Sequence, residues 1–143
     1  MDFCIGRITR PHTDVDWYVE DGHATSIVAE LIADGWTPDD RLPIERQADL
    51  SWDGIELSVS PVRVNDFGLP TVGPGPWEGE PLPRDMLTDA GRSTLAGVAA
   101  SFISPMAQIE LKVMMRHWRP ELPFREKDEQ DAALLCRHLF HPS

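Results

Sequence analysis

Apolar and polar residues alternate along two neighbouring segments of the chain. Residues 55–64 show the period-two pattern of a half-buried strand, and residues 47–52 predict a shorter strand before it. Asp53-Gly54 between them is a strong two-residue hairpin turn. One face of the longer strand carries Ile55, Leu57 and Val59, and the other carries Glu56, Ser58 and Ser60.

Helical periodicity marks three further segments. A helix starting at Asp21-Gly22 and ending at Gly35 carries apolar residues at helical spacing. Residues 104–140 predict two C-terminal helices, and the first begins with Ser104 as N-cap and Pro105 at the first helical position. The final helix is expected over residues 125–140, and the first six residues resemble the end of a helix.

The remaining segments predict irregular structure. Residues 68–85 hold five prolines and four glycines around Trp77, which favours a long structureless loop, either a mobile lid or a disordered excursion. Trp36 and Pro38 open an acidic turn, and residues 94–102 predict one last short strand and a turn.

Composition limits the class of protein. A chain of 143 residues with 41% hydrophobic content is expected to form one soluble domain. Cys4 and Cys136 have no metal-type spacing and indicate reduced thiols in the cytoplasm, and no segment is apolar enough to cross a membrane. The net charge of −11 argues against nucleic acid as the main partner. It would attract a cationic ligand, although it would equally keep a cytoplasmic protein in solution.

Asp14 and Asp16 form the first candidate site. In an extended strand, these two carboxylates point to the same face, roughly 6–7 Å apart along the backbone. Val15 and Trp17 then face the other way, toward apolar packing. Paired carboxylates on a strand suit a hard cation with oxygen ligands, above all Mg²⁺.

The residues around this pair carry a family resemblance. Gly-Arg-x-Thr-Arg-x-His-x-Asp-Val-Asp spans residues 6–16 and follows Asp2. It resembles the active-site segment of the aminoglycoside 2''-nucleotidyltransferases and lincosamide nucleotidyltransferases, members of the polymerase-β-like nucleotidyltransferase superfamily. Weaker similarities extend the resemblance over most of the chain: residues 54–61, residues 104–112, and Lys127-Asp128 with Asp131.

The resemblance implies an α+β fold of the polymerase-β-like nucleotidyltransferase type, a small mixed sheet flanked by helices, with residues 1–143 as a single domain. In the family, a Gly-Gly turn that approaches the nucleotide phosphates precedes the motif. This sequence begins just after that point, so the fold is expected to be N-terminally shortened.

The implied activity is Mg²⁺-dependent transfer of a nucleoside monophosphate from a nucleoside triphosphate such as ATP. The acceptor would be a hydroxyl of a small, cationic molecule such as an aminoglycoside, which would make the protein an antibiotic-resistance adenylyltransferase. Asp14 and Asp16 would hold the metal, while Arg10, His12 and Lys112 would bind the triphosphate.

A third carboxylate is expected beside the aspartate pair, and the matching position here is Ser58. Serine has no negative charge and no useful basicity near neutral pH. Glu56, two residues earlier on the same face, is the substitute candidate for the base, and its alternative role is that of a solvent-facing strand residue.

Two other interpretations remain open. The protein could be a non-catalytic relative that binds a nucleotide or a cationic ligand after losing the third carboxylate. A second copy of the chain could also cover an exposed edge of the sheet, which would give a homodimer.

Overall fold

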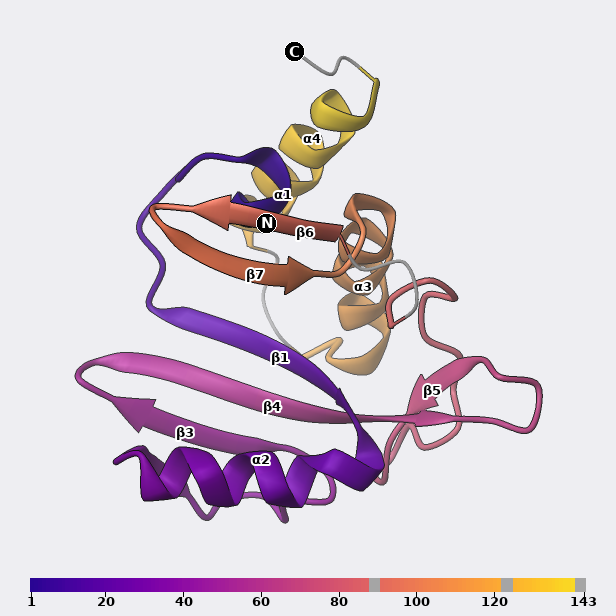
Figure 1. Ribbon diagram of the computed structural model, residues 1–143. Helices are drawn as coiled ribbons and strands as arrows, with labels where there is room; N and C mark the ends of the chain where they lie inside the picture. The colour runs from indigo at the N-terminus through magenta and orange to yellow at the C-terminus, as the bar shows by residue number, and fades with distance from the viewer. Residues whose placement is uncertain (88–90, 122–124, 141–143) are drawn as a thin grey trace. The chain divides into compact units, whose positions relative to one another are not determined.

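The computed structural model describes residues 1–87, 91–121 and 125–140. The chain divides into two compact units (Figure 1). The sheet unit is Pro11–Leu82, and the helix unit combines Met1–Arg10 with Pro83–Ser143. The assignment of residues 1–143 to a single domain stays a prediction.

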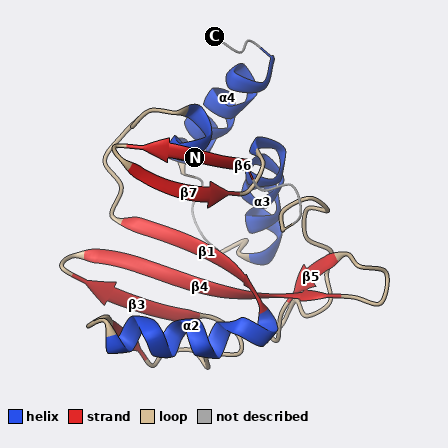
Figure 2. Ribbon diagram, in the orientation of Figure 1, coloured by secondary structure: helices blue, strands red, loops and turns tan. Residues whose placement is uncertain are grey.

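A mixed five-stranded sheet forms the sheet unit. The strand order is β1-β4-β3-β2, and β5 pairs with β4. The edge strand β1 runs parallel to β4 (Figure 2). The other strand pairs are antiparallel. The strands are β1 (Asp14–Glu20), β2 (Thr37–Asp39), β3 (Ala48–Trp52), β4 (Ile55–Val64) and β5 (Pro70–Val72).

The hairpin between β3 and β4 confirms the turn predicted at Asp53-Gly54. Both residues adopt a positive φ, 49° for Asp53 and 78° for Gly54. Two left-handed residues in succession match the right-handed twist of the flanking strands. The turn therefore fixes the register of the hairpin, in which Asp49 lies opposite Ser58.

Helix α2 (Asp21–Ala33) covers the apolar face of this sheet. The core joins Val28 of the helix to the inward-facing residues of the two central antiparallel strands, and Leu31 packs against it. Strand residues alternate between the two faces, so the residues between these core positions lie on the opposite, polar face of the sheet. The strand residues in this core are Ala48, Leu50, Leu57 and Val59.

Two segments expected to be irregular are ordered in the sheet unit. A strand, β2, occupies the predicted acidic turn after Trp36. The predicted loop over residues 68–85 is not structureless throughout, because Pro70–Val72 pairs with β4 and the Val72 amide donates to the Glu80 carbonyl at 2.9 Å. Proline is compatible with an edge strand, because one side of such a strand has no partner and its amide hydrogens are not needed for pairing there.

The helix unit contains a short helix, a hairpin and two longer helices. The hairpin replaces the single strand expected over residues 94–102, because Ala96 and Gly97 form a turn with positive φ values of 50° and 82°. The Ser104 hydroxyl accepts a 3.0 Å hydrogen bond from the Ala107 amide, which confirms the predicted N-cap. The elements are α1 (Asp2–Ile5), β6 (Gly91–Leu95), β7 (Val98–Phe102), α3 (Pro105–Trp118) and α4 (Glu126–Phe140).

None of the helices within the described part of the chain combines the length and hydropathy needed to cross a membrane.

Candidate active site

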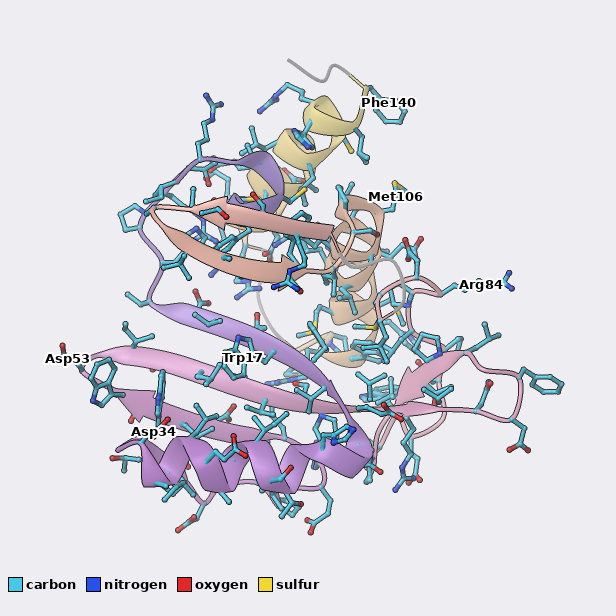
Figure 3. All side chains as sticks on the ribbon, viewed as in Figure 1. Trp17, Asp34, Asp53, Arg84, Met106 and Phe140 are labelled. Carbon is cyan, nitrogen blue, oxygen red and sulfur yellow. The ribbon has the colours of Figure 1, made fainter. Side chains whose placement is uncertain are left out.

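Asp14 and Asp16 stand on the polar face of the sheet unit. They occupy alternate positions of β1, and both residues are exposed. Because strand residues alternate, Val15 and Trp17 point to the opposite face. They are still 43% and 44% exposed, so the apolar packing expected for them is incomplete; Trp17 is labelled in Figure 3. The strand therefore presents the two carboxylates side by side, as the sequence predicts.

The parallel register of β1 and β4 places two further polar residues beside this pair. Asp14 lies opposite Glu56, and Asp16 lies opposite Ser58. Neighbouring strands are about 4.8 Å apart, and directly opposed residues point to the same face. The structure thus brings the candidate base Glu56 next to Asp14 and leaves Ser58 next to Asp16.

Sequence reasoning missed Asp49 on β3. The Ser58 hydroxyl donates a 2.7 Å hydrogen bond to Asp49 Oδ1, and the side-chain amide of Gln47 donates to the same oxygen at 2.7 Å. Asp49 therefore extends the row formed by Asp16 and Ser58 across a third strand. A signal was present, because counting outward from the two-residue turn places Asp49 opposite Ser58. The polar face with Asp14, Asp16, Glu56 and Asp49 is called the acidic face below.

Tyr18 follows Asp16 on the same face of β1. Burial raises the pKa of its phenol to about 12, and the nearby charge of Asp16 adds to that rise. The phenol is therefore protonated at neutral pH and can donate a hydrogen bond, but it cannot serve as a base.

The donor chemistry of the acidic face fits Mg²⁺. Within residues 1–87, 91–121 and 125–140, no group of three or more histidine, cysteine, aspartate or glutamate side chains is arranged to enclose a metal ion. Asp14 and Asp16 would leave most of the coordination shell to water and to oxygen atoms of a ligand. Mg²⁺ is commonly bound in this way, through one or two carboxylates together with water and substrate phosphate oxygens.

Two of the predicted phosphate ligands, Arg10 and Lys112, meet in the helix unit. Arg10 Nη2 lies 3.3 Å and Lys112 Nζ 3.1 Å from Asp131 Oδ2, and Lys112 also reaches Asp128 Oδ1 at 3.2 Å. The Asp131 side chain is only 7% exposed. Both cations thus join the start of the chain and helix α3 to carboxylates of α4.

These contacts change the titration of the two aspartates. Burial alone would raise the pKa of Asp131, but hydrogen bonds from Arg10 and Lys112 and their positive charges bring it below its usual value. The pKa of Asp128 is likewise lowered, because hydrogen bonds from Arg125 and Lys112 outweigh its burial. Both carboxylates are therefore ionised at neutral pH.

The third predicted phosphate ligand, His12, belongs to the sheet unit. It is exposed and comes two residues before β1. The boundary between the units falls after Arg10, so the motif of residues 6–16 contributes residues to both.

Comparisons with known proteins identify the fold. No family model and no curated protein sequence matches the chain. Among solved structures, the lincosamide antibiotic adenylyltransferase LnuA bound to lincomycin has a TM-score of 0.69 and 20% identity, covering 94% of this chain and 79% of LnuA.

The antibiotic-resistance factor ANT(2'')-Ia matches in two structures. Its solution structure gives a TM-score of 0.70 at 18% identity, covering 96% of this chain and 69% of that one. Its complex with adenylyl-2''-tobramycin gives 0.69 at 19% identity, with 96% and 74% covered. At this level of identity the likeness establishes the architecture and confirms the predicted fold: the chain has the nucleotidyltransferase fold of these antibiotic-modifying enzymes.

Proposed function

We propose that the protein is a Mg²⁺-dependent nucleotidyltransferase that transfers a nucleoside monophosphate from a triphosphate to a hydroxyl of a small molecule. The observation that carries the proposal is the pair of exposed carboxylates, Asp14 and Asp16, on one face of β1 in a chain with this fold.

Asp14 and Asp16 would hold the metal ion through their carboxylate oxygens. Bound there, Mg²⁺ would supply positive charge to the transferred phosphoryl group and to the departing pyrophosphate. His12 lies two residues before the strand and is exposed, so its ring can donate a hydrogen bond to a phosphate oxygen. Glu56 beside Asp14 adds negative charge to the same face.

The acceptor class is proposed from charge and from the structural neighbours. The net charge of −11 favours a cationic acceptor, because opposite charges raise the rate of encounter. The neighbours include a lincomycin-bound adenylyltransferase and a complex with adenylyl-2''-tobramycin, so we take ATP as the donor and lincomycin and tobramycin as the first acceptors to test. The two free cysteines are consistent with a cytoplasmic location.

Calorimetric titration of Mg²⁺ and ATP tests the metal–nucleotide site without a choice of acceptor. The wild type should bind ATP in the presence of Mg²⁺ and lose this binding in the Asp14→Asn, Asp16→Asn double variant. An Asp53→Asn, Asp66→Asn double variant removes the same charge from exposed turn residues and should bind like the wild type. If the folded wild type binds none of ATP, GTP, CTP and UTP, the proposal is wrong.

Ser58 favours a second candidate function, a binding protein without catalysis. It places a hydroxyl beside Asp16 where the resemblance expects a carboxylate. Under this alternative, the protein binds Mg²⁺ and ATP but releases no pyrophosphate with any acceptor. A pyrophosphate-release assay therefore distinguishes the binding protein from the nucleotidyltransferase.

A further inference from the structure

Ser58 is the one polar side chain of β4 that stands directly beside Asp16. A base that serves transfer must take a proton close to the metal-binding pair, and this strand position is closest to Asp16 across the sheet. The serine hydroxyl cannot keep the proton, because it has no useful basicity near neutral pH. A carboxylate that could accept the proton contacts Ser58 from β3, on the side away from Asp16.

That contact is the hydrogen bond from the Ser58 hydroxyl to Asp49 Oδ1, 2.7 Å long. Ser58 is the donor in this hydrogen bond, so its hydroxyl hydrogen points toward Asp49. The lone pairs of Ser58 Oγ are then available to a second donor. Both residues are half-buried, so a ligand on the acidic face can reach them.

Gln47 holds the carboxylate in place. Its side-chain amide donates to Asp49 Oδ1 at 2.7 Å, the oxygen that also accepts from Ser58. Two donors on one oxygen restrict rotation of the carboxylate, and the register of the hairpin places the pair on adjacent strands. Asp49 thus lies two strands away from Asp16, about 10 Å at the backbone, which is too far to share its metal ion directly.

We propose that Ser58 and Asp49 act together as the base of the transfer reaction, with Ser58 relaying the proton and Asp49 receiving it; this inference rests on the proposed function. The acceptor hydroxyl donates to Ser58 Oγ while Ser58 gives its own proton to Asp49. The acceptor oxygen forms a bond to the α-phosphorus, and the bond from that phosphorus to pyrophosphate breaks. The products are the nucleotidylated acceptor, pyrophosphate and a protonated Asp49.

Glu56 is less well placed for this task. It lies opposite Asp14, two residues from Ser58 and roughly 6–7 Å away along β4. It makes no side-chain contact with Ser58 in the described residues that would connect it to a hydroxyl beside Asp16. We assign Glu56 to the electrostatics of the metal site.

The relay determines which substitution at Ser58 is a useful test. A Ser58→Asp substitution alone would place a second carboxylate against Asp49, where two like charges repel. Combining Ser58→Asp with Asp49→Asn instead moves the carboxylate from β3 to β4 at constant charge. The new carboxylate would stand beside Asp16 and accept a hydrogen bond from the introduced amide.

The experiment measures two quantities for each variant: calorimetric binding of Mg²⁺ and ATP, and pyrophosphate release with water, lincomycin or tobramycin as acceptor. Asp49→Asn and Ser58→Ala should bind the nucleotide like the wild type but release pyrophosphate about 100-fold more slowly, the usual range for loss of a general base. The combined variant should recover much of the wild-type rate. Asp39→Asn, one strand further along the same row, is the matched control and should match the wild type.

Three outcomes overturn the relay while leaving the metal–nucleotide site intact. Asp49→Asn could release pyrophosphate at the wild-type rate, or the combined variant could be no faster than Asp49→Asn. A wild type that binds Mg²⁺ and ATP but releases pyrophosphate with none of the three acceptors also overturns it. Absence of nucleotide binding in the wild type would instead overturn the proposed function and the relay together.

Discussion

Asp14 and Glu56 lie directly opposite each other in the parallel register of β1 and β4. Both residues are exposed, and two like charges on adjacent strands repel each other unless a cation lies between or beside them. This relationship suits the proposed binding of a divalent ion, in which Glu56 would contribute negative charge.

The first prediction concerns Glu56→Gln. Removing this charge should weaken Mg²⁺-dependent ATP binding by about 1 kcal/mol, roughly fivefold. The effect is modest because solvent near the exposed Glu56 carboxylate reduces its Coulomb attraction to the ion. Titration of Mg²⁺ at fixed ATP measures the effect, with Glu30→Gln on the exposed side of α2 as control. Unchanged metal binding with loss of pyrophosphate release would instead identify Glu56 as the base.

A second prediction concerns Lys112→Met in the helix unit. The substitution removes one donor from Asp131 and one from Asp128, and Asp131 is nearly buried. We expect the free energy of unfolding to fall by about 1–2 kcal/mol, the range for a partly buried carboxylate that loses a charged donor. Urea denaturation measures it. Arg137→Met removes an exposed cation from α4 and should change stability much less; equal losses would contradict a specific role for Lys112.

The third prediction is the acid sensitivity of this ion network. The pKa values of Asp128 and Asp131 are lowered in the folded protein, so their contribution to stability is present above the ordinary aspartate pKa of about 3.9. It is lost as the pH falls through the lower, folded values. The free energy of unfolding should therefore decrease below about pH 4 less steeply in Lys112→Met than in the wild type. If the free energy of unfolding falls equally steeply with pH in both proteins, the ion network does not contribute to acid sensitivity.

A fourth prediction tests the turn that sets the register of the acidic face. Gly54 has a φ of 78° with no atom within 4 Å of an added Cβ, so Gly54→Ala introduces backbone strain without a clash. We expect a loss of about 1 kcal/mol in the free energy of unfolding. Gly22→Ala, in the first turn of α2 with equally open surroundings, should be neutral or stabilising. An equal loss of stability in Gly22→Ala would contradict the attribution of the Gly54→Ala effect to its positive φ.

Local patterns in the sequence predict much of the sheet unit. The alternation over residues 55–64 and the turn at Asp53-Gly54 determine both strands and their faces, since each depends on neighbouring residues alone. The pairing of β1 with β4 is different, because about 40 residues separate Asp14 from Glu56 and no local signal specifies a parallel partner. Only the family resemblance implies that the Ser58 position lies beside the aspartate pair, and the structure adds that Glu56 lies directly opposite Asp14.

Two other features of the structure, strand β5 and the role of Asp49, could not be predicted from the local sequence. The prolines and glycines of residues 68–85 indicate a loop, yet β5 forms there because an edge strand needs few of its amide hydrogens for pairing. Asp49 was overlooked for a related reason: it belongs to a short strand with no motif of its own, and its importance comes from the hydroxyl opposite it. The contact of Lys112 with Asp131 joins two helices and follows from tertiary packing alone.

The division of the chain after Arg10 has a consequence for biosynthesis. The helix unit is discontinuous, and the sheet unit is inserted into it. During translation, residues 11–82 can leave the ribosome and fold while the first ten residues still lack their partner, because domains generally fold as units in the order in which they emerge. Arg10 meets Asp131 only after another 121 residues have been added. Helix α4 therefore anchors residues 1–10, and the nascent protein carries an incomplete helix unit until that helix has been synthesised.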